Sequence, residues 1–256
     1  MKTVVIPDIH GRTEWKLIVH LENPDKVIFL GDYFDSFDIS GVEQIHNFKE
    51  IVQYKETSFT NSGKEDQHKT QVVMLIGNHD HHYFANVGYS HTSGYQKFIS
   101  HNITQVIEEN RHHLDMAHSM DEFLFTHAGV SPVFMDEVFG IDGWNADNIA
   151  YDLNEMFKFK PLSFLFNGKD FSGCGEHKSQ SPIWIRPSSL MSANKVTEKI
   201  PNGLKNKYIQ VVGHTIQNKI DTKGSSTGGR YYFVDVLPTS KEYMIIEDGA
   251  IRLNKI

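Results

Sequence analysis

The stretch TVVIPDIHG at residues 3–11 decides how this sequence is interpreted, because an apolar run ends there in two potential metal ligands. The run Thr3–Ile6 is β-branched and nearly continuous rather than alternating. Such runs are typical of strands in sheets that are covered on both faces, as in α/β proteins. Asp8 and His10 are separated by one residue, so both side chains can point from one strand end toward one cation.

The same pattern, an apolar run followed by ligand-type side chains, occurs four more times. These runs are Lys26–Leu30 before Asp32 and Asp35, Gln71–Ile76 before Asn78 and His79, Glu122–Thr126 before His127, and Tyr208–Val212 before His214. Ligand sites in α/β sheets gather beyond the carboxyl ends of the strands. We therefore expect these side chains to converge on one site, although they span most of the chain.

The composition limits the classes of protein that the chain can be. Its 256 residues carry 25 Lys+Arg and 32 Asp+Glu, a net charge of −7, which argues against a broad nucleic-acid surface. No stretch approaches the roughly 18 apolar residues of a membrane span. The single cysteine, Cys174, excludes an intramolecular disulfide framework. With no signal-peptide core at the N-terminus, we expect a cytoplasmic protein with one domain over residues 1–256.

The remaining segments are predicted from periodicity and composition. Apolar residues at helical spacing predict a helix over residues 42–52, and the polar residues 57–70 predict a loop. Residues 140–185 lack clear periodicity, and we interpret them as a cap-like insertion over the site. Residues 223–230 are rich in glycine and serine and predict a flexible loop. The alternating tail over 230–253 predicts two or three antiparallel strands.

The residue types at the strand ends suit a centre of two metal ions. Carboxylate, amide and imidazole ligands together favour Mn, Fe or Zn over Mg or Ca. Asp32 offers two carboxylate oxygens and can bridge two cations. Two divalent ions about 3.5–4 Å apart form a clamp for phosphoryl transfer. Each motif alone is weak, since strand-end Asp and His residues often cap helices, but chance is a poor explanation for the whole ordered series.

The motif series resembles the calcineurin-like metallophosphoesterase superfamily, and within it the serine/threonine phosphoprotein phosphatase type. That type is marked by Gly-Asp-x-His-Gly, Gly-Asp-x-Val-Asp-Arg-Gly and Gly-Asn-His-Glu, followed by two later histidines. The corresponding stretches here are PDIHG at 7–11, GDYFDSF at 31–37, GNHD at 77–80, THAG at 126–129 and GHT at 213–215.

The resemblance implies an α/β fold in which two mixed β-sheets pack face to face between helices, an α-β-β-α sandwich. It also implies two divalent metal ions, with Mn²⁺ favoured and Fe, Zn or Mg left open. The implied ligands are Asp8, His10 and Asp32 for the first ion and Asp32, Asn78, His127 and His214 for the second. His79 would be the general acid, and Asp35 would orient it.

The sequence departs from the family pattern at positions that bear on the substrate. Ser36 stands where the family has an arginine that binds the substrate phosphate. Asp80 replaces the glutamate of the third motif, which keeps the charge but shortens the reach. Arg186 is either the match to a second phosphate-binding arginine or a surface residue beside a core tryptophan. His81 and His82, which follow the third motif, either line the rim of the site or start a helix.

The expected function is hydrolysis of a phosphate ester by attack of a hydroxide that bridges the two metals. We expect a phosphomonoesterase or protein phosphatase, with a phosphorylated small molecule or a phosphoprotein as substrate. A dinucleoside polyphosphate or phosphodiester hydrolase is the alternative. An inactive scaffold with the same fold is disfavoured, because all six proposed ligands and His79 are present.

Overall fold

The N-terminal apolar runs build the first of two β-sheets in the computed structural model, which describes residues 1–60, 69–87, 93–196, 204–225 and 229–256. In spatial order its strands are β11 (Ala250–Lys255), β10 (Glu242–Glu247), β1 (Lys2–Ile6), β2 (Lys26–Phe29), β3 (Gln71–Leu75) and β4 (Leu114–Asp115). Strands β1 to β4 run parallel, whereas β10 and β11 are antiparallel to their neighbours. This sheet is therefore mixed.

The second sheet is also mixed. In spatial order its strands are β5 (Ala117–Met120), β6 (Phe123–Thr126), β7 (Ile209–Val212), β9 (Gly229–Phe233) and β8 (Asp221–Ser225). The three inner strands run parallel, and the two edge strands pair antiparallel with them.

Alternate residues of the inner strands contact two different cores, which explains why their apolar runs are continuous. Val4 and Ile6 of β1 belong to the core that includes Trp15 and Ile18 of the first helix. Val5, between them, belongs to the core that the two sheets share. A strand buried on both faces needs apolar residues at every position.

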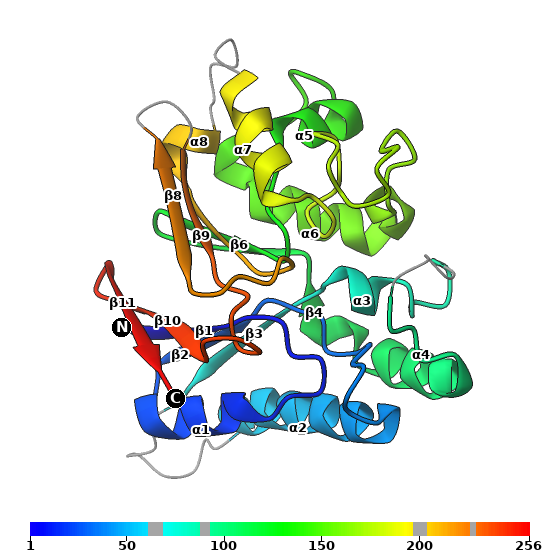
Figure 1. Ribbon diagram of the computed structural model, residues 1–256, viewed down its shortest axis with the longest axis vertical. Coiled ribbons are helices and arrows are strands. Elements are labelled where there is room, and N and C mark those ends of the chain that lie inside the picture. Colours follow the sequence, from blue (N-terminus) through cyan, green and yellow to red (C-terminus); the bar gives the residue numbers. More distant parts are fainter. Residues whose placement is uncertain (61–68, 88–92, 197–203, 226–228) are drawn as a thin grey trace.

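Helices cover the outer face of each sheet, as Figure 1 shows with α1 and α2 below the first sheet and α5 to α7 above the second. The α-helices are α1 (Glu14–Glu22), α2 (Gly41–Thr60), α3 (Asn78–His81), α4 (Ser100–Glu109), α5 (Pro132–Phe139), α6 (Ile149–Phe159), α7 (Pro187–Val196) and α8 (Leu204–Lys207). Short 3₁₀ helices are η1 (Lys97–Ile99), η2 (Arg111–His113), η3 (Ala146–Asn148) and η4 (Pro161–Phe164). The predicted α-β-β-α sandwich is confirmed.

The five predicted strands are confirmed to within one residue at each end. The helix predicted over 42–52 is α2, but it continues to residue 60, so the loop prediction is wrong for residues 57–60. The hydroxyls of Thr57 and Ser58 donate to carbonyls of the preceding turn, at Gln53 and Tyr54, which satisfies polar groups inside the helix. Residues 61–68 lie outside the described residues.

The C-terminal segments differ from the prediction in their pairing. Residues 223–225 belong to β8 and residues 229–230 to β9, so the predicted loop over 223–230 is wrong for these positions, and 226–228 lie outside the described residues. The tail contains the three predicted strands, but β9 joins the second sheet and runs parallel to β7. The other two tail strands, β10 and β11, pair antiparallel with each other on the first sheet.

The stretch 140–185 contains a regular helix, α6, that the sequence analysis missed. Its buried residues Ile149, Leu153, Met156 and Phe157 are spaced as one face of a helix, and they belong to the same large core as Val4 and Ile6. The interpretation as an aperiodic stretch is therefore wrong for these residues, while the cap-like role of 140–185 stays a prediction.

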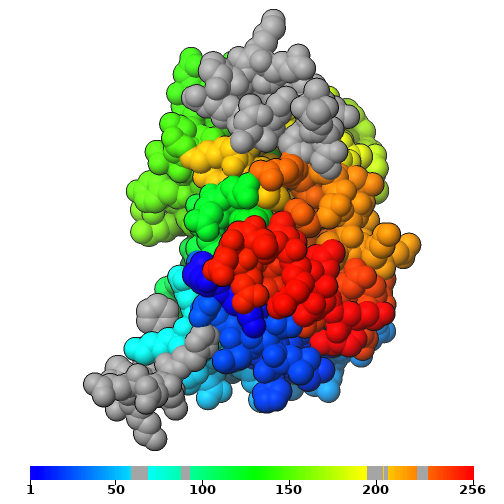
Figure 2. All heavy atoms as spheres, turned by 90° about the vertical axis from the view of Figure 1, so that its left-hand side faces the viewer, coloured from blue at the N-terminus to red at the C-terminus, as the bar shows by residue number. Residues whose placement is uncertain are grey.

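The N-terminus lies beside the turn of the C-terminal hairpin. The N-terminal amino group lies 2.7 Å from Asp248 Oδ1, in the turn between β10 and β11. Figure 2 shows the C-terminal hairpin in red beside the N-terminal residues in dark blue. Among the described residues, no helix combines the length and the apolar character that crossing a membrane requires.

Candidate metal centre

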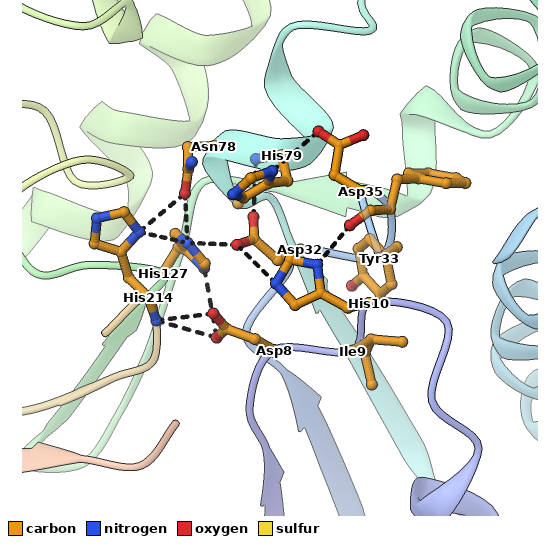
Figure 3. A network of polar contacts seen from close by, with 12 residues as sticks. Asp8, Ile9, His10, Asp32, Tyr33, Asp35, Asn78, His79, His127 and His214 are labelled. Atoms are coloured by element: carbon orange, nitrogen blue, oxygen red, sulfur yellow. Dashed lines mark hydrogen bonds and ion pairs between the residues drawn. The ribbon is translucent and has the colours of Figure 1, made fainter. Parts of the chain in front are cut away.

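The ends of five strands from both sheets converge on one polar centre, which Figure 3 shows. Asp8 follows β1, Asp32 follows β2, and Asn78 begins α3 after β3. His127 and His214 follow β6 and β7 of the second sheet. Parallel strands end at the same edge of a sheet, so the topology brings together residues that are far apart in sequence.

The gathered side chains form two groups that share one carboxylate. Asp8, His10 and Asp32 form the first group, and Asp32, His127 and His214 form the second, with ligand atoms within 4.8 Å of one another in each. Asn78 adds its amide oxygen, which lies 3.0 Å from His127 Nε2 and 2.9 Å from His214 Nδ1. The six predicted ligands thus lie together in the two predicted sets, and metal binding by them stays a prediction.

Each of the three histidines in the centre has one ring nitrogen directed at a backbone carbonyl. These contacts are His10 Nδ1 to Phe34 O at 2.6 Å, His127 Nδ1 to Leu30 O at 2.9 Å, and His214 Nε2 to Trp184 O at 3.1 Å. A carbonyl only accepts, so each of these nitrogens carries the proton. In the neutral form of each ring, the other nitrogen then turns a lone pair toward the centre, the arrangement typical of metal-ligating histidines.

These lone pairs fit a bound cation. His127 Nε2 and His214 Nδ1 lie 3.2 Å apart, and both face the Asn78 oxygen, so three atoms that can ligate a metal ion meet at one point. Burial lowers the pKa of His214 well below its ordinary value, and the charge of His127 lowers it further. Burial also lowers the pKa of His10. Both lowered pKa values favour the neutral rings at pH 7, the form in which histidine binds a metal ion.

Three buried carboxylates add to this argument. Burial raises the pKa of Asp8 well above its ordinary value, and the charges of Asp235 and Asp32 add to the effect. Burial opposes ionisation of Asp32, but His127 and His79 outweigh it and hold its pKa well below the usual range. Burial, with the charge of Asp32, raises the pKa of Asp235 to about 6. Positive ions in the centre would relieve the repulsion between these groups.

The backbone around the centre is strained in a consistent way. His10, Asp32, Asp35 and His214 all have positive φ angles, of 41°, 53°, 64° and 65°. This left-handed region is uncommon for residues other than glycine, although Asp and His tolerate it better than most. Such strain clusters at functional sites, where it aims side chains that a regular strand could not.

Two glycines leave room for the carboxylates. A Cβ atom on Gly77 would overlap the Asp32 carboxylate, and a Cβ atom on Gly213 would overlap that of Asp8. Asp80, in the third motif, holds the two loops that carry these residues, because its carboxylate accepts the backbone N–H groups of Gly77 and Asp32. It therefore joins the loop after β2 to the loop after β3.

The predicted pair of His79 and Asp35 is present, with 2.9 Å between His79 Nδ1 and Asp35 Oδ2. Burial lowers the pKa of His79, but the charge of Asp32 and the hydrogen bond to Asp35 outweigh burial and raise it. Asp35 has two further partners. The Tyr83 hydroxyl donates to Oδ1 at 2.5 Å, and His82 Nε2 lies 3.1 Å from Oδ2.

His82 and Tyr83 are functional candidates that the sequence analysis did not identify as such. His82 is buried at the C-terminal end of α3, against Asp35, so it neither lines the rim nor starts a helix. His81 lies within α3, buried, with Nε2 2.9 Å from Pro161 O. The sequence carries no signal for these contacts, because Asp35 is more than 40 residues away in the chain.

A cavity of about 320 Å³ opens onto the centre, and Arg186 lines it. Arg186 donates from Nε to Cys174 O at 2.7 Å and from Nη1 to His214 O and Thr215 Oγ1, both at 3.0 Å. The Nη2 atom of Arg186 donates no hydrogen bond to the described residues. Arg186 is thus placed in the cavity, and phosphate binding by it stays a prediction.

Two other cavity residues were missed, although signals for both exist. Arg12 follows the first motif by one residue and lines the same cavity. Asp235 ends the run YYFV at 231–234, which repeats the pattern of an apolar strand followed by a ligand-type side chain. Ser36, which stands in place of the family arginine, also lines this cavity, and its hydroxyl accepts the N–H groups of Asp38 and Ile39 within its own loop.

Comparison with known proteins agrees with this geometry. The cold-active protein-tyrosine phosphatase of the psychrophile Shewanella sp. superposes with a TM-score of 0.61 and 15% identity, over 98% of this chain and 77% of that chain. The protein serine/threonine phosphatase from Saccharomyces cerevisiae with similarity to human phosphatase PP5 gives a TM-score of 0.55 and 11% identity, over 100% of this chain and 80% of that chain. At these identities the likeness shows the fold alone.

In sequence, none of the curated proteins compared with the chain matches it. The family model for calcineurin-like phosphoesterases, however, matches residues 1–237, which include every residue of the centre. The motif series, the two-sheet sandwich and this match agree, and the chain belongs to the calcineurin-like phosphoesterase family.

Proposed function

We propose that this protein is a metal-dependent phosphomonoesterase that binds two divalent ions. Asp8, His10 and Asp32 would hold one ion, and Asp32 with Asn78, His127 and His214 would hold the other. The observation that carries the proposal is the sharing of Asp32 between two ligand groups beside the His79–Asp35 pair. The mixed nitrogen and oxygen donors favour Mn²⁺, with Fe, Zn or Mg as alternatives.

The bound ions would supply Lewis acidity toward the phosphoryl group and toward water. His79 contributes a proton, since its Nδ1 contacts Asp35 and its Nε2 is the nitrogen left for the leaving oxygen. Asp35 fixes the orientation of the ring. Arg186 has a planar guanidinium in the cavity, held by three hydrogen bonds, that is suited to a phosphoryl oxygen.

The size of the cavity supports a small monoester over the dinucleoside polyphosphate alternative. Its volume of about 320 Å³ lies at the lower end of the range typical of small-molecule sites. Both solved relatives carry the name of a protein phosphatase, which supports a phosphomonoester as substrate, either a phosphorylated small molecule or a phosphoprotein side chain. The complete ligand set and the intact His79–Asp35 pair argue against an inactive scaffold.

The test compares p-nitrophenyl phosphate with bis(p-nitrophenyl) phosphate, with and without Mn²⁺, for the wild type and His79→Gln. We expect Mn²⁺-dependent hydrolysis with a preference for the monoester. On an alkyl phosphate, His79→Gln should lower kcat by roughly 10²–10⁴, the contribution typical of general acid catalysis, and on p-nitrophenyl phosphate by less, while the metal content stays unchanged.

The matched control is His20→Gln, which makes the same substitution at an exposed histidine of α1 and should leave kcat unchanged. Metal-loaded wild type that hydrolyses neither ester would contradict the proposed function. Loss of bound metal in His79→Gln would show that the histidine is a ligand rather than the acid.

A further inference from the structure

The loop after Asp35 presents an aromatic ring to the cavity of the centre. Phe37 is 78% exposed, although it is apolar, and it lines the same cavity as the metal-ligand residues. Ile216 lines this cavity as well and is 64% exposed. Single exposed apolar residues are common on protein surfaces, but both of these line the cavity of a charged centre, where a bound ligand can contact them.

The exposure of Phe37 results from a well-fixed backbone. The Ser36 hydroxyl accepts the N–H groups of Asp38 at 3.3 Å and Ile39 at 3.2 Å, which closes a turn around Phe37. Gln96 Nε2 donates to Ser36 O at 3.0 Å, and Ser36 N donates to Gln44 Oε1 at 3.3 Å. The backbone of this loop is preorganised, so a ligand that covers the ring pays little entropy for ordering the loop.

Phe37 lies on the side of the centre where the leaving group belongs. His79 must reach the leaving oxygen to protonate it, and His79 is joined to Asp35, two residues before Phe37. Arg186 lies on the side of His214, whose carbonyl accepts its hydrogen bond. Figure 3 shows Asp35 and His214 on opposite sides of the centre. Phosphoryl oxygens held by Arg186 would therefore leave the organic group on the side of Phe37.

We propose that the substrates are phosphate monoesters of phenols, of the tyrosyl type, whose ring packs against Phe37. This inference rests on the proposed function and names its substrate class. Two aromatic rings in edge-to-face or offset contact stabilise a complex beyond the burial of their area. The short aliphatic chain of a seryl phosphate presents no ring to this surface.

The test measures kcat/KM for O-phosphotyrosine and O-phosphoserine with Mn²⁺-loaded wild type and Phe37→Ala. We expect the ratio of the two kcat/KM values to fall about two- to tenfold in the variant, mainly through a higher KM for phosphotyrosine. The different leaving-group pKa values cancel, because the variant and the wild type are compared on the same two substrates.

Two further variants sharpen the test. Phe98→Ala removes the same side chain from a fully exposed position outside the cavity, and it should leave the ratio unchanged. Phe37→Leu keeps an apolar side chain without a ring, and we expect it to lower the ratio as well. An unchanged ratio in Phe37→Ala overturns the inference, and full recovery in Phe37→Leu overturns its aromatic part.

The affinity for phosphonates, which are not hydrolysed, tests the role of Phe37 independently of the proposed phosphatase activity. Calorimetry of the Mn²⁺-loaded protein compares phenylphosphonate with methylphosphonate, which need no turnover. The wild type should bind phenylphosphonate more tightly, and Phe37→Ala should lose most of the difference. Equal affinities in the wild type overturn the inference. Preferential binding without hydrolysis of any ester instead contradicts the proposed function.

Discussion

Asp35 has more partners than a two-residue pair with His79 requires. Its Oδ1 accepts the Tyr83 hydroxyl, and the Tyr83 oxygen in turn accepts the backbone N–H of Gln96 at 2.8 Å. The Tyr83 ring stacks on Tyr95, with 5.3 Å between centroids. Tyr83 is therefore a positioning residue, which holds the carboxylate in the orientation that His79 needs.

Removing that hydroxyl should weaken general acid catalysis. In Tyr83→Phe, Oδ1 of Asp35 loses a donor to a buried charged group, an interaction of about 1.5–3 kcal/mol. We expect kcat to fall about tenfold for alkyl phosphates and less for p-nitrophenyl phosphate, whose leaving group needs little protonation. Steady-state kinetics with both substrates, together with metal analysis, checks this.

The control for Tyr83→Phe is Tyr151→Phe, the same change at an exposed tyrosine of α6. It should leave both rates unchanged. Equal losses of kcat on both substrates in Tyr83→Phe would indicate a general structural role instead.

At the scale of elements, one glutamate joins the first helix to the last two strands. Glu22 ends α1, and its Oε1 accepts the Tyr243 hydroxyl of β10 at 2.7 Å and the Asn254 amide of β11 at 2.8 Å. Lys2 and Arg252 lie 3.7 and 3.5 Å from its other oxygen. Burial opposes ionisation of Glu22, but these hydrogen bonds and cations outweigh it and lower its pKa.

This lowered pKa predicts a pH dependence of stability. Because the folded state holds Glu22 ionised, its contribution is fully present above the unfolded pKa of about 4.3 and is lost as the pH falls through the folded pKa. We expect Glu22→Gln to be less stable than the wild type by about 1 kcal/mol at pH 6, with a smaller difference at pH 3.5.

Urea unfolding at both pH values measures this difference. Glu155→Gln, on the exposed face of α6, makes the same change where the side chain is 40% exposed, and it should leave the pH dependence unchanged. A difference between Glu22→Gln and the wild type that is the same at both pH values would contradict the assignment.

Among the strands, the buried inner ones were predictable from local sequence, and the edge strand β8 was not. The inner strands β1, β2 and β3 are apolar at nearly every position because both of their faces are covered. A run of apolar residues is visible within each strand's own sequence. The edge strand β8 carries the polar sequence Asp221–Ser225, and its pairing depends on backbone bonds to β9. No periodicity of its own side chains marks it as a strand.

At the scale of the whole molecule, the proposed metal centre joins the two sheets. Asp8 and Asp32 extend from the first sheet, and His127 and His214 from the second, so bound ions would link both halves of the sandwich. Removal of the ions would leave buried carboxylates and unprotonated nitrogens facing one another. The stability of the whole fold is therefore expected to depend on the metal.

Chelation should lower the melting temperature of the wild type. With free Mn²⁺ at 100 times its dissociation constant, binding to the folded state contributes about 2.7 kcal/mol per site, which corresponds to several degrees in a chain of this size. Thermal unfolding with Mn²⁺ and with a chelator measures the shift. Asp32→Asn, which removes the shared carboxylate charge, should show little shift, and an equally large shift in that variant would contradict the shared-ligand geometry.

The sequence by itself determined the buried strands and the ligand-type residues that follow them, because both appear in local runs such as VVIPDIH at residues 4–10. The sandwich of two sheets was implied by the resemblance of the motif series. Only the tertiary structure decided that β9 joins the second sheet while β10 pairs with β1. It alone brought Tyr83 to Asp35 and placed Phe37 at the cavity. The physical reason is that these contacts arise from the pairing and packing of distant segments, which the residues near each position do not encode.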